Sequence, residues 1–303
     1  MHESTPKSFS STVAKQVGAP RRAFAALMLS NICLAFGPWF VRLADVGPTA
    51  SAFWRLTLAV PFLLVAMRML DERVPRMGLA LWGTMALSGL FFAGDLASWH
   101  FGILQTKLAN ATLFGNSTSL MFPIYGFLVA RAWPNRSQAV ALFLAAFGAA
   151  LLMGRSYELS SRNLIGDLLC LFAGVLYTFY FIAMTRARMV MGPVTALTFS
   201  TIGGIAPLLL FAVLFGEAIW PHDWSPLIGL AIVSQVIGQG LVIYALGHLS
   251  PLIIGLALLI QPVITATIGW LAYGERLGTL DLMGAIAVAI ALVLVRRPDK
   301  RAA

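Results

Sequence analysis

Charged side chains are scarce in this chain. Only 11% of its 303 residues are Asp, Glu, Lys or Arg, whereas an average soluble domain carries about 25%. A surface that faces water needs more charge than this, so the composition excludes an ordinary soluble globular protein. Hydrophobic residues make up 59% of the chain, which favours a protein that folds inside a membrane.

Common catalytic and metal-binding motifs are also missing. The sequence holds no Gly-x-Ser-x-Gly elbow, no Gly-x-x-x-x-Gly-Lys phosphate loop and no His-Glu-x-x-His pair, which argues against an intramembrane enzyme and against ATP hydrolysis by this chain. The only two cysteines, Cys33 and Cys170, stand in apolar segments, where packing is a better interpretation than a disulfide. We therefore expect no enzymatic activity, no cofactor and no metal.

The apolar residues are grouped in blocks of about twenty, the length that an α-helix needs to cross the hydrocarbon core. The sequence therefore predicts an all-α, polytopic membrane protein with ten transmembrane helices between a flexible tail at 1–21 and a short tail at 298–303. The predicted spans are 22–42, 49–70, 78–101, 108–130, 136–154, 164–186, 194–216, 226–247, 252–273 and 279–295.

Basic residues are unevenly distributed between alternate loops. If residue 1 lies in the cytoplasm, fifteen of the 21 Lys and Arg residues fall in cytoplasmic segments and one, Arg55, falls inside a helix. The other five fall in outer segments: Arg42, Lys107, Arg155, Arg162 and Arg276. This bias follows the positive-inside rule. It predicts a bacterial inner-membrane protein with both termini in the cytoplasm, and it leaves no basic surface for nucleic acid.

Two short motifs recur in the same order at nearly equal offsets. Gly47-Pro48 recurs as Gly192-Pro193, 145 residues later, and Gly94-Asp95 recurs as Gly238-Gln239, 144 residues later. In both Gly-Pro pairs the proline can open a helix, because its missing N–H would be unpaired there anyway. The recurrence predicts a duplicated chain.

The predicted repeats, 22–155 and 164–297, hold five spans each. Because five is an odd number, the second repeat enters the membrane in the opposite orientation. Inverted repeats of this kind are typical of secondary transporters, whose binding site lies near the membrane midplane between the halves.

Longer motifs carry a family resemblance. They are Gly94-Asp95-Leu96 with Trp99-His100, Ala109-Asn110-Ala111-Thr112-Leu113, Gln261-Pro262-Val263 and Tyr273-Gly274-Glu275-Arg276-Leu277. Together with the two halves, they resemble the ten-helix EamA-type members of the drug/metabolite transporter superfamily over nearly all of 22–297. The first half departs from the pattern, because Ala132-Trp133-Pro134 stands where a second glutamate is expected.

The resemblance implies export of amino acids or related metabolites by alternating access. An uptake carrier for a nutrient or cofactor precursor and a lipid-handling flippase are the alternatives. The expected partners are a small-molecule substrate and membrane lipid, and proton coupling is compatible with the sequence. Either a monomer or a homodimer fits the sequence.

Ionisable residues inside the spans are costly in hydrocarbon and are therefore candidates for the site. Arg55 and Asp95 are predicted at similar depth near the outer face, where they could pair. An arginine can bind a substrate carboxylate through its planar fork, and an aspartate can attract an ammonium group. Snorkelling to the lipid headgroups is the alternative for Arg55. His100 lies near a helix end, where capping competes with a substrate role.

Uncharged polar residues within the spans need hydrogen-bond partners, which can be substrate or neighbouring helices. Three aromatic residues, Trp54, Trp99 and Tyr244, stand close to these polar positions in the sequence. The complete predicted substrate-binding set is Arg55, Asp95, Trp99, His100, Asn116, Gln235, Gln239, Tyr244 and Gln261.

Overall fold

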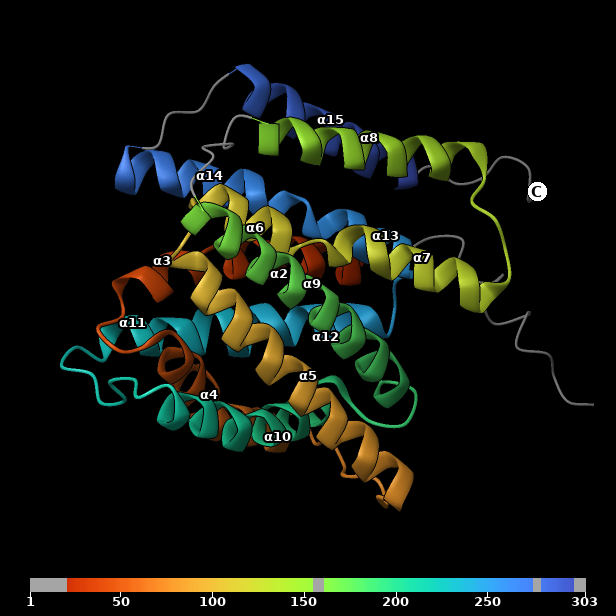
Figure 1. Ribbon diagram of the computed structural model, residues 1–303. Coiled ribbons are helices and arrows are strands. Elements are labelled where there is room, and N and C mark those ends of the chain that lie inside the picture. Colours follow the sequence, from red (N-terminus) through yellow and green to blue (C-terminus); the bar gives the residue numbers. More distant parts are fainter. Residues whose placement is uncertain (1–20, 155–160, 275–278, 297–303) are drawn as a thin grey trace, which may run out of the picture.

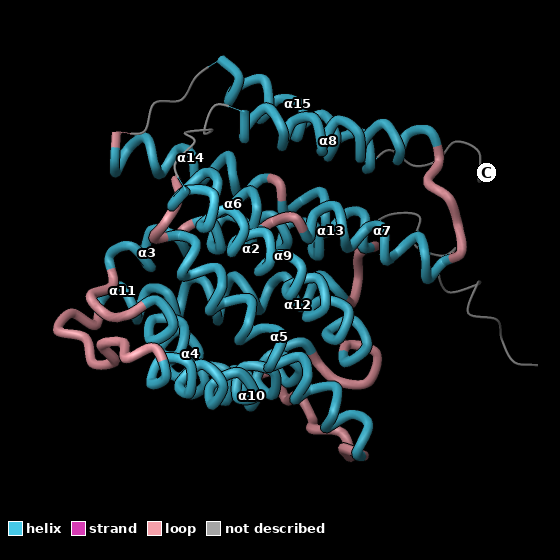
Figure 2. The backbone as a smooth tube through the Cα atoms, viewed as in Figure 1, coloured by secondary structure: helices cyan, strands magenta, loops and turns pink. Residues whose placement is uncertain are grey.

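The structure is a computed structural model that describes residues 21–154, 161–274 and 279–296. Within these ranges every regular element is a helix (Figures 1 and 2). Among the described residues, eight helical segments are long and apolar enough to cross a membrane. The prediction of an all-α, polytopic membrane protein is confirmed, and the predicted tails fall almost wholly outside the described residues.

The described residues of the first half, 21–154, form seven helices. They are α2 (Arg21–Ala35), α3 (Gly37–Leu43), α4 (Pro48–Met69), α5 (Leu79–Ile103), α6 (Leu108–Gly115), α7 (Thr118–Ala130) and α8 (Arg136–Gly154). The second half follows the same course. Its helices are α9 (Ser161–Ala187), α10 (Pro193–Leu214), α11 (Ser225–Gly229), η1 (Leu230–Gln239), α12 (Gly240–Leu246), α13 (Pro251–Leu258), α14 (Ile260–Tyr273) and α15 (Thr279–Arg296).

Helices α8 and α15 correspond to the fifth and tenth predicted spans. They pack against each other and lie together along one edge of the molecule (Figure 1). They are not among the eight described segments that are long and apolar enough to cross a membrane, so the count of ten spans stays a prediction.

The contacts between helices recur when each helix is exchanged with its counterpart in the other half. Helix α4 packs against its own counterpart α10, and α8 packs against its counterpart α15. Helix α7 packs against α13, and the exchanged pair, α14 with α6, also packs. Helix α5 packs against α9. The counterpart of α9 is α2 and the counterparts of α5 are η1 and α12, and these helices also pack against each other. A twofold relation between the halves produces this pattern, so the contacts support the predicted inverted repeat.

Two counterpart spans are broken near their middle. The first breaks between α6 and α7, where Asn116, Ser117 and Thr118 follow one another; short polar side chains compete with the helix for backbone hydrogen bonds. The second breaks at Leu259, between α13 and α14. Pro262 causes this break, because it cannot donate to the carbonyl of Leu258 and its ring clashes with that turn.

The span formed by α11, η1 and α12 differs from its counterpart α5. Residues Leu230–Gln239 form a π-helix, whereas α5 is a regular α-helix throughout. Wider π turns are rare and occur frequently at functional sites. This segment carries Gln235 and Gln239, two of the predicted site residues.

Helices α5 and α10 approach each other closely at a pair of glycines. A Cβ atom on Gly89 would lie 2.6 Å from the backbone carbon of Gly203. We expect Gly89→Ala to destabilise the protein by about 1–3 kcal/mol, because the backbone of α10 must shift to make room. Gly83→Ala is the matched control on the same helix, since a Cβ there meets nothing within 4 Å. Thermal unfolding in detergent measures both, and equal melting temperatures would contradict the expectation.

Candidate functional site

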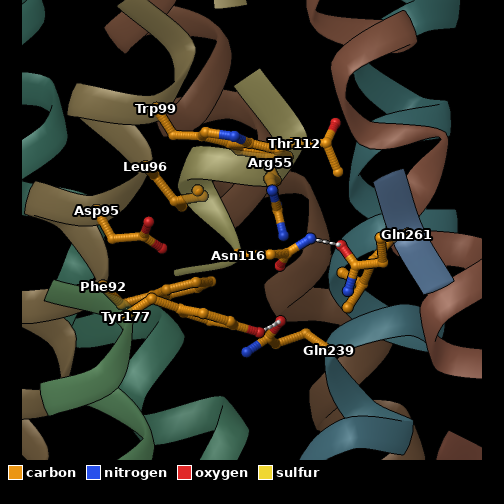
Figure 3. Close-up of a pocket in the computed structure, with 12 residues that line it drawn as sticks. Arg55, Phe92, Asp95, Leu96, Trp99, Thr112, Asn116, Tyr177, Gln239 and Gln261 are labelled. Atoms are coloured by element: carbon orange, nitrogen blue, oxygen red, sulfur yellow. Dashed lines mark hydrogen bonds between the residues drawn. The ribbon is translucent and has the colours of Figure 1, made fainter. Parts of the chain in front are cut away.

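A cavity lies between the two halves, at the level of the broken helices (Figure 3). Its volume is about 40 Å³ for the centre of a water molecule, so it has room for a few waters. Both halves supply its walls. The lining residues are Leu34, Arg55, Phe92, Asp95, Leu96, Trp99, Thr112, Gly115, Asn116, Tyr177, Gln239 and Gln261.

Arg55, on α4, is held in place from behind the cavity. Its Nε donates to Gln235 Oε1 at 3.0 Å, and Gln235 Nε2 in turn donates to Thr201 Oγ1 at 3.1 Å. The guanidinium carbon lies 5.8 Å from the centre of the Phe92 ring, within the range of a cation–π contact. Only 3% of Arg55 is exposed, so the side chain does not snorkel to the membrane surface.

The outer fork of Arg55 remains available. In the part of the chain that the structure describes, the two terminal nitrogens of its guanidinium donate to no side chain or carbonyl. Gln235 therefore orients the fork without occupying it. A planar fork in this state is suited to a carboxylate, which can accept one hydrogen bond from each of the two terminal nitrogens.

Asp95, on α5, points into the same cavity (Figure 3). Its side chain is 7% exposed, and its carboxylate makes no hydrogen bond or ion pair with any described residue. The predicted contact between Arg55 and Asp95 is therefore not formed, because Arg55 turns toward Gln235 on η1. The guanidinium of Arg55 and the carboxyl group of Asp95 face one cavity without a direct bond between them.

A chain of amides crosses the cavity at the two helix breaks. Asn116 Nδ2 donates to Gln261 Oε1 at 3.3 Å, and Gln261 Nε2 donates to Asn31 Oδ1 at 2.8 Å. Asn31 Nδ2 ends the chain on the carbonyl of Leu27 at 2.7 Å. Asn116 and Gln261 are 145 residues apart, the offset of the repeat, so counterpart residues meet across the interface between the halves.

Gln239 forms a further part of the cavity wall, at the end of the Tyr177 side chain (Figure 3). The hydroxyl of Tyr177 donates to Gln239 Oε1 at 3.1 Å, while the buried Gln239 Nε2 has no partner among the described residues. Trp99 also lines the cavity, and its indole N–H donates to the carbonyl of Ala111 at 3.1 Å. Tyr177 is absent from the predicted set, although a tyrosine hydroxyl inside a span needs a partner as much as an amide does.

Three predicted site residues, His100, Tyr244 and Gln235, do not line the cavity. His100 is fully buried, and its Nδ1 lies 2.8 Å from Ser51 Oγ and 3.1 Å from the carbonyl of Pro48, which supports the capping interpretation at the start of α4. Tyr244 packs against His248, with 4.5 Å between ring centres. Gln235 stands behind Arg55, and the other six predicted residues all line the cavity.

Two copies of one family model match this sequence. The model describes the EamA-like transporter family, and it matches residues 21–154 and again residues 164–297. The chain belongs to the EamA-like transporter family. The two matches coincide with the repeats predicted from the Gly-Pro motifs, and the family is that of the resemblance stated above. This EamA-like protein is therefore a membrane transporter.

Relatives of this EamA-like protein are also transporters. An uncharacterized transporter of Archaeoglobus fulgidus is 27% identical over 275 residues, which cover 89% of this chain and 94% of the relative. The threonine/homoserine exporter RhtA of Escherichia coli K12 is 30% identical over 153 residues, and the match covers 50% of this chain and 52% of the exporter. A solved crystal structure shares the fold, with a TM-score of 0.73 and 16% identity over 91% of this chain and 96% of that one.

Proposed function

We propose that this protein is a secondary transporter that exports small zwitterions, such as amino acids, across the bacterial inner membrane by alternating access. One observation carries the proposal. The free fork of Arg55 and the unpaired carboxylate of Asp95 face the same buried cavity. An α-amino acid carries the two complementary charges on one small molecule.

The cost of burial strengthens this reasoning. A charged group in the membrane interior is expensive unless it is paired or hydrogen-bonded. A bound zwitterion supplies both partners, because its carboxylate can accept from Arg55 while its ammonium group donates to Asp95. The small cavity must widen for this, which favours a compact solute and a binding step coupled to a conformational change.

Export and proton coupling belong to the same proposal. The name of the RhtA relative supports an amino-acid substrate and outward transport. The chain carries no phosphate-binding loop, so the driving force is a gradient of a proton or of the substrate itself. Asp95 is the residue that we propose to exchange a proton when the ammonium group leaves.

Counterflow in proteoliposomes tests the proposal. We expect liposomes that contain the purified protein and a high internal concentration of one amino acid to accumulate the same radiolabelled amino acid. A carrier exchanges unlabelled internal substrate for labelled external substrate without any other driving force. A panel of amino acids identifies the substrate, and protein-free liposomes are the control.

Two other results would contradict the proposal. Scrambling of a fluorescent lipid without amino-acid counterflow would favour a flippase. Counterflow combined with greater sensitivity of overexpressing cells to a toxic analogue of the substrate would favour an uptake carrier, whereas resistance of those cells supports export.

A further inference from the structure

Two glutamates far from the cavity tie the halves of the molecule together. Glu72, which follows α4, accepts hydrogen bonds from the backbone N–H groups of Val194 at 3.3 Å and Thr195 at 2.8 Å, in the first turn of α10. Glu217, which follows α10, accepts from Thr49 at 3.2 Å and Ala50 at 2.8 Å, in the first turn of α4.

These two contacts are related by the repeat. Glu72 and Glu217 are 145 residues apart, as are the N–H groups that each of them binds. Helices α4 and α10 are therefore antiparallel, and the contacts lie at opposite ends of the pair. The lengths of the matching bonds agree within 0.1 Å.

Each helix depends on the other half for its cap. The residues that precede α4 and α10 are Gly47 and Gly192, which offer no side-chain acceptor. A carboxylate at a helix N-terminus satisfies unpaired N–H groups and interacts favourably with the helix dipole. A Cβ on Gly47 would overlap Glu217, and one on Gly192 would overlap Glu72, so the glycines leave the space that the glutamates fill.

We propose that Glu72 and Glu217 are positioning residues of the transport cycle, each acting as a latch that holds the two halves together at one face of the membrane. The inference rests on the alternating access of the proposed function. The halves must separate at one face while the other stays closed, so the two latches oppose each other. Their relative strength biases the equilibrium between the two open states.

The two latches differ in one respect. The hydroxyl of Thr195 adds a further bond to Glu72 at 2.9 Å, whereas the counterpart of Thr195 is Ala50, which has no hydroxyl. Thr195→Ala therefore weakens the Glu72 latch without removing its carboxylate. It should shift the equilibrium in the same direction as Glu72→Gln, but by less.

Other bonds support the end that carries Glu217. The indole N–H of Trp54 donates to the carbonyl of Ile219 at 2.6 Å, and the carboxylate of Asp45 accepts from the N–H groups of His222 at 2.8 Å and Asp223 at 3.2 Å. The bond from His222 lowers the pKa of Asp45, so this carboxylate stays ionised at neutral pH. Because these ties survive in Glu217→Gln, we expect its effect to be smaller than that of Glu72→Gln.

Accessibility of the cavity tests the latches directly. The reporter is Thr112→Cys, on the cavity wall, in a background in which Cys33 and Cys170 are alanine. A membrane-impermeant maleimide is applied to right-side-out or inside-out vesicles, and the ratio of the two labelling rates is measured. We expect Glu72→Gln to raise the labelling rate from the face of Glu72 by about tenfold, because losing a hydrogen bond to a charged group changes an equilibrium constant by about that factor.

The expected direction is opposite for the second latch. Glu217→Gln should raise labelling from the other face, and the double variant should return toward the wild-type ratio. Asp223→Asn is the control, because among the described residues its carboxylate accepts hydrogen bonds only from Ser225, in the same half. A loss of folding would not move the two single variants in opposite directions.

The outcomes separate this inference from the proposed function. Unchanged ratios, or shifts in the same direction, would overturn the latches even if amino-acid counterflow is observed. Opposite shifts without any amino-acid counterflow would support the latches and reject the proposed substrate.

Discussion

Asp95→Asn should reduce amino-acid counterflow by about tenfold to a hundredfold at substrate concentrations below saturation. The amide keeps the shape of the side chain but loses the charge that the ammonium group of the substrate needs. A hydrogen bond between a charged group and its partner contributes about 1.5–3 kcal/mol, and each 1.4 kcal/mol is a factor of ten in affinity. Initial rates in proteoliposomes give the measurement.

Asp95→Asn should not unfold the protein. The carboxylate has no hydrogen-bond partner among the described residues, so the change leaves no protein group unpaired. We expect wild-type membrane expression and an unchanged melting temperature in detergent. A deaminated analogue of the substrate, which has no ammonium group, provides the matched probe, because its binding should be insensitive to the change. Counterflow at the wild-type rate would reject the assignment of Asp95.

Arg55→Lys should reduce counterflow by a similar factor, even though the positive charge is kept. Lysine has no planar fork, and it cannot reproduce the bond from Nε to Gln235 that orients the guanidinium. The carboxylate of the substrate would lose its two-point contact. Initial rates measured with the amino acid should fall strongly, and the apparent affinity should fall with them.

The decarboxylated amine is the probe that isolates the role of Arg55. This analogue lacks the group that Arg55 is proposed to bind, so Arg55→Lys should leave its weak competition for the site unchanged while Asp95→Asn removes it. Equal effects of Arg55→Lys on the amino acid and on the amine would contradict a carboxylate contact. They would indicate that Arg55 acts through packing against Phe92 and Gln235.

The missing ion pair between Arg55 and Asp95 changes what a double variant should show. Because the two side chains make no direct hydrogen bond, the double-mutant coupling of Asp95→Asn with Arg55→Gln in stability should be smaller than the roughly 3–5 kcal/mol expected on breaking a buried ion pair. Their effects on transport should not add, because both residues are proposed to hold one substrate.

The sequence predicted the fold best where the membrane imposes a pattern of hydrophobic residues on the chain. A helix must be apolar over about twenty residues to cross the bilayer, so the spans are visible without any knowledge of their partners. The Gly-Pro motifs at 47 and 192 revealed the duplication, because both open a helix with the same backbone geometry. The cost of burying polar groups also identified Arg55, Asp95, Asn116, Gln239 and Gln261, all of which line the cavity.

What the sequence alone determined is therefore the membrane class, the repeat and most of the polar residues of the cavity. The tertiary structure alone decided which polar groups meet. Arg55 binds Gln235, 180 residues away, rather than Asp95, and Glu217 binds the start of α4 across 167 residues. Such partners depend on which faces of antiparallel helices come together, because side-chain hydrogen bonds act only over about 3 Å. The hydrophobic pattern along each span does not indicate which faces these are.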